Sequence, residues 1–152
     1  MNPLIKNTLS IVIPTFNEEG NIEILYSKLI ETLTPLEIDE FEFVFVDDGS
    51  QDRSLELIKK LSKDDSRVKY ISFSRNFGHQ PALKAGLDHA QFAGVVSLDA
   101  DLQHPVELIP EMIEKWKNGA EVVYTKRKDV SLPWFKRTTS KLFYRIINTL
   151  SQ

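Results

Sequence analysis

The sequence predicts an α/β protein with a mainly parallel β-sheet and helices on both of its faces. Short apolar runs that suit strands alternate with segments whose apolar residues recur at helical spacing. Such alternation builds βαβ units with right-handed crossovers, which make successive strands parallel. Two of the apolar runs end in acidic residues, and sheets of this kind bind ligands beyond the carboxyl ends of their strands.

Five strands are expected, and each is short and apolar. The first should stop at Pro14, because proline lacks the N–H that a strand donates to its neighbour. The run from Gly94 to Leu98 is small or apolar throughout, which is typical of a buried strand in a parallel sheet. The expected strands are 9–13, 41–46, 68–72, 94–98 and 122–124.

Helices are expected between these strands. Ile22, Leu25, Leu29 and Leu33 recur at helical spacing, and Asn21 before them suits an N-cap. Further helices are expected around 55–61, at 81–90 and 105–118, and at 134–150 after a short linker.

The composition is that of an ordinary globular protein, with 152 residues, 41% hydrophobic and 27% charged. The absence of cysteine excludes disulfides and thiolate metal sites. We expect neither a secretory signal nor a membrane span, because the N-terminus lacks an apolar core segment and no stretch approaches ~18 apolar residues. These features favour a cytoplasmic protein.

The net charge of −3 is unevenly distributed. Residues 126–152 contain 7 of the 19 Lys and Arg residues and a single acid, Asp129. This basic tail suits an anionic partner, either a phosphate or a lipid surface, although a solvated helix face fits the charge equally well. The helix expected at 134–150 has apolar and cationic residues that suit a membrane-facing helix or one packed on its own sheet. No nucleic-acid partner is expected.

Acidic residues follow two of the expected strands. Asp99 and Asp101 come directly after the run 94–98, and Asp47 and Asp48 follow the run 41–46. Because parallel strands end at one edge of the sheet, these carboxylates should share that edge. Paired carboxylates suit a hard divalent cation of the kind that holds substrate phosphates.

Other phosphate-binding patterns are missing. No G-x-G-x-x-G follows the first expected strand, and no G-x-x-x-x-G-K-[ST] occurs. Phosphate binding would therefore need metal and basic side chains. The histidines His79, His89 and His104 lack metal-ligand spacing, so we expect them to bond to backbone or water, with His104 near enough to Asp101 for an indirect role.

Three blocks of sequence together resemble the motifs of GT-A glycosyltransferases of family 2. They are Val12 to Glu19, Val46 to Asp52 and Asp99 to Pro105. The stretch from Ser74 to Ala82 further resembles the polyprenyl-phosphate branch, which includes bactoprenol glucosyltransferases and dolichol-phosphate mannose synthase. The resemblance covers nearly the whole chain and implies the Rossmann-like GT-A fold.

The resemblance implies a nucleotide site at the first two blocks. Pro14, Phe16 and Glu18 match the loop that contacts the base and ribose, and Phe16 stands where the family often has tyrosine. Asp48 matches the acid that contacts the base or ribose, whereas Asp47 is expected to order its loop.

The resemblance also implies a metal and diphosphate site. Asp99, Asp101 and Gln103 match the residues that hold Mg²⁺ or Mn²⁺ and the diphosphate, with Asp101 as the main ligand. Arg127 matches a basic residue that meets a phosphate, although Thr125 replaces a glycine that is common just before it. A cation there would stabilise the charge on the departing diphosphate as a Lewis acid.

The implied activity is inverting transfer of a sugar from a nucleotide diphosphate sugar to an acceptor, with polyprenyl phosphate favoured. Such an anionic acceptor needs little help from a general base, whereas a sugar hydroxyl needs a carboxylate. Past Tyr124 the chain offers only Asp129 for that role. The branch implies cell-envelope polysaccharide synthesis at the cytoplasmic face of the inner membrane.

The expected organisation is a nucleotide-sugar-binding domain over 1–127, then a linker and basic amphipathic helix over 128–152. Members of this branch typically continue further, so we expect a short version or fragment that holds the donor site and lacks much of the acceptor site. The nucleotide, the sugar and the oligomeric state remain open.

Two alternative functions are also compatible with these features. A donor-binding module would bind the nucleotide sugar without turnover. A receiver-type signalling domain also has paired acids, Mg²⁺ and a lysine after its fifth strand, where Lys126 falls. Its acidic pair, however, ends the first strand, whereas here the pair ends the second.

Overall fold

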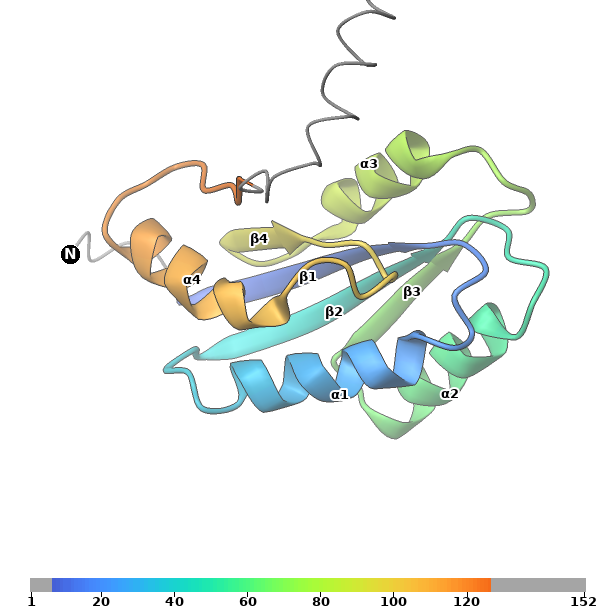
Figure 1. Cartoon of the computed structure of the whole chain (residues 1–152), viewed down its shortest axis with the longest axis horizontal. Coiled ribbons are helices and arrows are strands. Elements are labelled where there is room, and N and C mark those ends of the chain that lie inside the picture. Colours follow the sequence, from blue (N-terminus) through green and yellow to red (C-terminus); the bar gives the residue numbers. More distant parts are fainter. Residues whose placement is uncertain (1–6, 127–152) are drawn as a thin grey trace, which may run out of the picture.

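The computed structural model describes residues 7–126. The described chain forms a four-stranded parallel sheet in the order β3-β2-β1-β4, flanked by helices (Figure 1). The elements are β1 (Thr8–Thr15), α1 (Ile22–Leu33), β2 (Glu40–Asp47), α2 (Ser54–Asp64), β3 (Val68–Ser72), α3 (His79–His89), β4 (Gly94–Ser97), the 3₁₀ turn η1 (Val106–Leu108) and α4 (Ile109–Lys117).

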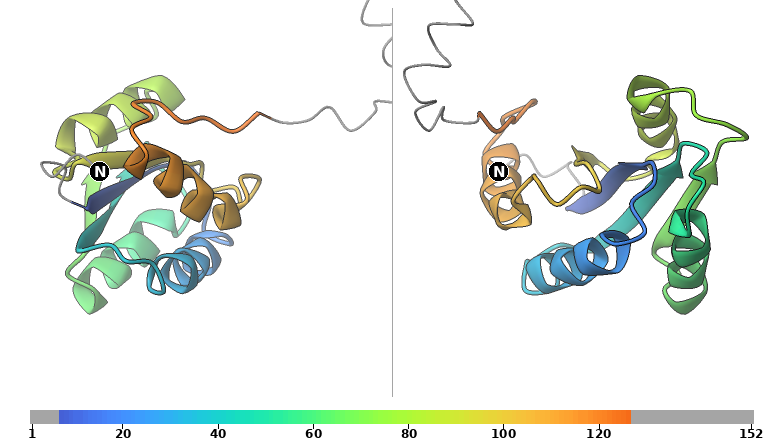
Figure 2. Two further views of the ribbon diagram at one scale, coloured as in Figure 1. Left: turned by 90° about the vertical axis from the view of Figure 1, so that its left-hand side faces the viewer. Right: turned by 45° about the vertical axis from the view of Figure 1, so that its right-hand side comes forward.

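Helices cover both faces of the sheet, which confirms the predicted fold class (Figure 2). On one face α1, α2 and α4 bury an apolar core against side chains such as Ile11, Phe43 and Phe45. On the other face α3 packs through Ala82 against a smaller valine cluster. The period-two alternation of a strand explains this division, because successive side chains of β1 and β2 point to opposite faces.

Close packing of α3 on β1 depends on Gly86. A Cβ atom at this position would lie 2.3 Å from Cγ1 of Val12 in β1. The absence of a side chain therefore lets the helix approach the sheet. This contact places the first residue of α3, His79, near the carboxyl end of the sheet.

The first strand continues through Pro14 to Thr15, so the predicted stop at this proline is wrong. Val12 accepts a hydrogen bond from the N–H of Leu98, which shows that Val12 faces β4. Pro14, two residues on, faces the same side, where the ladder with β4 has already ended at Ser97. The missing N–H of the proline therefore interrupts no pairing.

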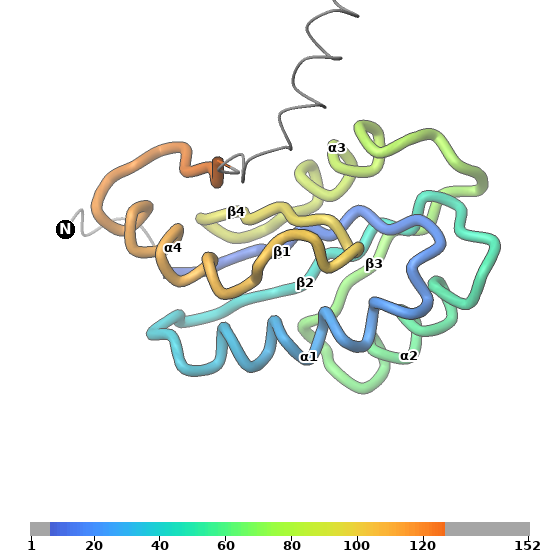
Figure 3. The backbone as a smooth tube through the Cα atoms, viewed as in Figure 1, coloured from blue at the N-terminus to red at the C-terminus, as the bar shows by residue number. Residues whose placement is uncertain are grey.

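The fourth strand is an edge strand rather than the buried strand that its apolar sequence predicts. It pairs with β1 alone among the described strands, and its side chains alternate between buried and exposed. The predicted strand at 122–124 is absent: Figure 3 shows an irregular segment after α4. Val122 and Tyr124 are 82% and 80% exposed, so these apolar residues gain no burial that would hold them in the sheet.

The third helix begins at His79, two residues before the predicted start. Pro81 lies in its first turn, where the missing N–H of a proline leaves no intrahelical hydrogen bond unmade. No helix among residues 7–126 is both long and apolar enough to span a bilayer. The predicted linker and amphipathic helix at 128–152 lie outside the described residues.

Candidate active site

An open cavity of about 310 Å³ lies at the carboxyl ends of β1, β2 and β4, next to the start of α3. The predicted acidic edge of the sheet therefore exists, since carboxylates from two strand ends line this one cavity. Residues from all three motif blocks contribute to its wall. The lining residues are Pro14, Thr15, Phe16, Glu18, Asp48, Asn76, Gly78, His79, Ala82, Asp99, Ala100 and Asp101.

The loop after β1 brings Pro14, Phe16 and Glu18 to the cavity wall. Hydrogen bonds fasten this loop to the one that follows β2: the N–H of Asn17 donates to Ser50 Oγ (3.0 Å), and the N–H of Glu18 donates to Ser54 Oγ (2.8 Å). The two predicted nucleotide-binding blocks thus form one joined surface. Phe16 is 41% exposed and available for stacking.

The Glu18 carboxylate has a partner within its own loop. Its Oε2 atom accepts a hydrogen bond from Asn21 Nδ2 at 2.6 Å. Asn21 occupies the N-cap position of α1, as predicted, but its side chain makes no capping hydrogen bond to the helix. The asparagine therefore orders the loop rather than the helix end.

Both acids at the end of β2 are buried and accept hydrogen bonds from the chain. Asp48 is 4% exposed and receives the backbone N–H groups of Phe77 (2.7 Å) and Gly78 (2.9 Å) on its two oxygens. Asp47 is 1% exposed and accepts the N–H of Ser50 (3.3 Å) and the hydroxyl of Ser72 (3.2 Å). Asp47 thus has the loop-ordering role predicted for it, and Asp48 clamps the segment that leads into α3.

The segment before α3 passes very close to the turn after β2. A Cβ atom at Gly49, whose φ is +71°, would lie 2.4 Å from the carbonyl carbon of Arg75. Only glycine combines this backbone conformation with such a close approach. Arg75 lies over the ring of Phe77, 4.6 Å from its centroid.

The acids after β4 lie in a different environment. The side chain of Asp99 is 39% exposed, and Asp101 is half-buried. Asp101 Oδ1 accepts the N–H of Gln103 at 2.9 Å in a tight turn, and Leu102 between them has φ +59°. A leucine in the left-handed region costs about 1 kcal/mol, which shows that the surroundings fix this turn. Gln103 belongs to the same turn but does not line the cavity.

The sequence interpretation missed the role of His79. Its Nε2 atom lies 2.8 Å from Asp99 Oδ1, so it bonds to a carboxylate rather than to backbone or water. His89 does bond to backbone, at Ala85 O (2.8 Å), as predicted. His79 lies in the block Ser74 to Ala82, whose resemblance to the polyprenyl-phosphate branch could have indicated a role in the site.

The carboxylates of Asp99 and Asp101 fit a divalent cation that also binds a diphosphate. Residues 7–126 contain no group of three or more His, Cys, Asp or Glu arranged to hold a metal alone. A cation that also binds substrate phosphates needs only one or two protein carboxylates, and Asp99 and Asp101 provide two. His104 Nδ1 is buried with no hydrogen-bond partner among residues 7–126 and lies 3.8 Å from Asp99 Oδ2, so a polar nitrogen is present on this side of Asp99.

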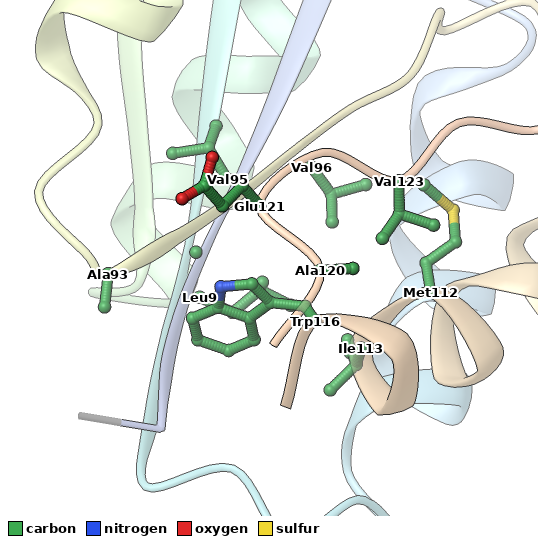
Figure 4. Close-up of a pocket in the computed structure, with 11 residues that line it drawn as sticks. Leu9, Ala93, Val95, Val96, Met112, Ile113, Trp116, Ala120, Glu121 and Val123 are labelled. Carbon is green, nitrogen blue, oxygen red and sulfur yellow. The ribbon is translucent and has the colours of Figure 1, made fainter. Parts of the chain in front are cut away.

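Arg127, the predicted phosphate-binding cation, lies outside the described residues. A second pocket of about 120 Å³ lies at the opposite end of the strands, next to Leu9 and Gly94 (Figure 4). All of its lining residues except Glu121 are of apolar types, and they include Trp116 and Met112 of α4. The close-up shows a single carboxylate, that of Glu121, among the labelled side chains, so this pocket lacks the converging polar groups of the acidic cavity.

Comparison with known proteins agrees with these observations. Residues 10–152 match the family described as Glycosyl transferase family 2. The chain is 50% identical over 145 residues to the uncharacterized glycosyltransferase YkcC of Bacillus subtilis, covering 93% of this chain and 44% of that protein. It is 45% identical over 144 residues to a prophage bactoprenol glucosyl transferase homolog of Escherichia coli, covering 94% and 47%. The chain thus spans less than half the length of these relatives.

Solved structures with the same fold include a mannosyltransferase. The mannosyltransferase PcManGT of Pyrobaculum calidifontis, in complex with GDP-Man and Mn²⁺, superposes with a TM-score of 0.56 at 25% identity, covering 70% of this chain and 30% of that one. TarS of S. aureus in complex with UDP has a TM-score of 0.54 at 23% identity, covering 80% and 40%. The sheet and helices therefore have the GT-A arrangement.

Proposed function

The chain belongs to glycosyl transferase family 2, and from that premise we propose that its acidic cavity binds a nucleotide diphosphate sugar for inverting transfer to a polyprenyl phosphate. One observation carries the proposal: side chains from the three motif blocks, far apart in sequence, line a single cavity at the carboxyl edge of the sheet. Family membership also argues against the receiver-domain alternative.

The wall formed by Phe16 and Pro14 suits the nucleoside. An exposed aromatic ring offers a stacking surface for a base, and the fastened loops keep this surface in place. Asp48 lines the same cavity, but both of its oxygens already accept backbone N–H groups. A ribose hydroxyl would therefore share an oxygen that has a second lone pair free to accept it.

The acids that follow β4 suit the diphosphate. Asp101, with Asp99 assisting, would hold Mg²⁺ or Mn²⁺ there, and such a cation supplies Lewis-acid stabilisation of the leaving diphosphate. The solved relative with GDP-Man and Mn²⁺ supports this cofactor class. Within this chain, His79 holds Asp99 and the turn at Gln103 holds Asp101, so the carboxylates are oriented before any ligand binds.

The relatives named as bactoprenol glucosyl transferases support a polyprenyl-phosphate acceptor. Its phosphate is anionic at neutral pH and can attack the sugar without losing a proton to a base. We propose that Arg127 meets a phosphate through paired N–H donors and that residues 134–150 lie against the membrane surface.

Separate measurements of donor binding and sugar transfer test the proposal. The chain is incubated with radiolabelled UDP-, GDP- and dTDP-sugars and Mn²⁺, with and without detergent-dispersed polyprenyl phosphate. We expect one nucleotide sugar to bind and its label to pass to the lipid fraction only when the lipid phosphate is present. Polyprenol without a phosphate is the matched acceptor control.

Two outcomes would change the conclusion. Binding without any transfer would assign this chain to a donor-binding module that needs further sequence for turnover. No binding of any of the three nucleotide sugars in the presence of Mn²⁺ would contradict the proposed site altogether.

A further inference from the structure

We propose that His79 is a positioning residue, which fixes the Asp99 carboxylate in the orientation that receives the cation-bound diphosphate. The inference rests on the proposed function and adds to it a residue outside the acidic motifs. Because an ionised carboxylate only accepts hydrogen bonds, Nε2–H of His79 donates to Asp99 Oδ1 across 2.8 Å.

This contact uses one oxygen of Asp99 and constrains the other. Rotation of the carboxylate is restricted by the hydrogen bond at Oδ1, so Oδ2 keeps a fixed direction. His104 Nδ1 lies 3.8 Å from Oδ2, beyond hydrogen-bonding distance, and has no other partner. Among the described residues, Asp99 is thus hydrogen-bonded through Oδ1 alone, which leaves Oδ2 able to accept a ligand.

The position of His79 is fixed by the packing of the residues around it. The two residues before it, Phe77 and Gly78, donate their backbone N–H groups to the buried Asp48 carboxylate. Gly78 has φ +99°, a conformation that turns the chain directly into α3. The close packing of Gly86 against Val12 then holds α3 against β1. The contacts of Asp48 with Phe77 and Gly78 and of Gly86 with Val12 therefore place the His79 imidazole beside Asp99.

Stability alone does not explain the pair. The side chains of His79 and Asp99 are 51% and 39% exposed, and polar pairs at such positions contribute little to folding. Partners that orient a metal-binding carboxylate, in contrast, typically change metal affinity by about 10-fold to 100-fold when they are removed. We therefore expect the contact between His79 and Asp99 to change metal affinity much more than the stability of the fold.

The test compares nucleotide affinity with and without the metal. Titration calorimetry gives the affinity for UDP, GDP and dTDP in saturating Mn²⁺ and again in EDTA, and the ratio of the two is the metal enhancement. For His79→Ala we expect the enhancement to fall about tenfold while the metal-free affinity is unchanged. His79→Gln keeps an N–H donor and should restore part of the enhancement.

His89→Ala is the matched control, because His89 lies in the last turn of the same helix and, within residues 7–126, hydrogen-bonds to Ala85 O and not to the cavity. It should leave both affinities unchanged, and thermal unfolding should show that all variants are folded. An unchanged enhancement in His79→Ala, with metal-dependent binding intact in the wild type, would overturn this inference alone. Absence of metal-dependent binding in the wild type with every nucleotide would overturn the proposed function, and the inference with it.

Discussion

The two acidic strand ends have similar sequences but different environments. After β2, Asp47 and Asp48 are almost fully buried, and their oxygens accept hydrogen bonds from backbone and serine groups of neighbouring loops. After β4, Asp99 and Asp101 are partly exposed at the cavity. The acids after β2 therefore hold neighbouring loops together, and Asp48 does so while it lines the cavity, whereas each acid after β4 accepts fewer hydrogen bonds and is more open to a ligand.

This difference has a structural cause. β2 is a central strand, with β1 and β3 on either side, so loops from both neighbours close over its end. β4 has a described neighbour on one side only, and fewer loops cover the acids that follow it. A buried carboxylate must have hydrogen-bond donors, whereas an exposed one can be left for a ligand.

The largest expected effect follows from replacing Asp48. Asp48→Ala leaves the N–H groups of Phe77 and Gly78 without their acceptor, and hydrogen bonds to a charged group contribute about 1.5–3 kcal/mol each. We expect the free energy of unfolding in urea to fall by about 3 kcal/mol. Asp99→Ala, the matched change at the other strand end, should cost less than about 1 kcal/mol. Equal losses for the two variants would remove the distinction between the strand ends.

A smaller effect is expected at Asp65, which lies just after α2 at the opposite edge of the sheet. Hydrogen bonds from the Arg67 guanidinium lower the pKa of Asp65 from 3.8 to about 2, and the hydroxyl of Tyr26 adds to this effect. Since the folded-state pKa is depressed, the stabilisation is complete above pH 3.8 and is lost as the pH falls towards about 2.

Asp65→Asn should therefore lower the free energy of unfolding by about 1 kcal/mol at pH 7. The difference from the wild type should shrink as the pH falls below 3.8. Urea unfolding of both proteins at pH 7, 4 and 3 measures this difference in the free energy of unfolding. A difference that grows towards low pH would show that the Arg67 contact does not set the pKa of this carboxyl.

Most of the fold could be predicted from the sequence, because periodicity and strand-ending residues report on burial and pairing. The range 68–72 was predicted correctly as a strand. The predictions for Pro14 and 122–124 were wrong because they depend on which neighbour pairs with a strand edge, and local sequence does not contain that information.

Residue types in the site were easier to predict than their contacts. The sequence indicated that Asp48, Asp99 and Asp101 share an edge, and all three line the cavity. It could not show that Asp48 clamps Phe77 and Gly78 or that His79 reaches Asp99, since these contacts join residues 20 to 30 positions apart. Such contacts follow from the way α3 packs on the sheet.

The central claim is that the acids after β4 bind a cation that holds the diphosphate, whereas those after β2 mainly hold the loops of the fold together. Calorimetric titration of UDP, GDP and dTDP into the wild type and Asp101→Ala, each with Mn²⁺ and with EDTA, tests it most directly. The account predicts Mn²⁺-dependent binding in the wild type and its loss in a folded Asp101→Ala. Equal affinity of the two proteins in Mn²⁺, or wild-type binding that is unaffected by EDTA, would contradict it.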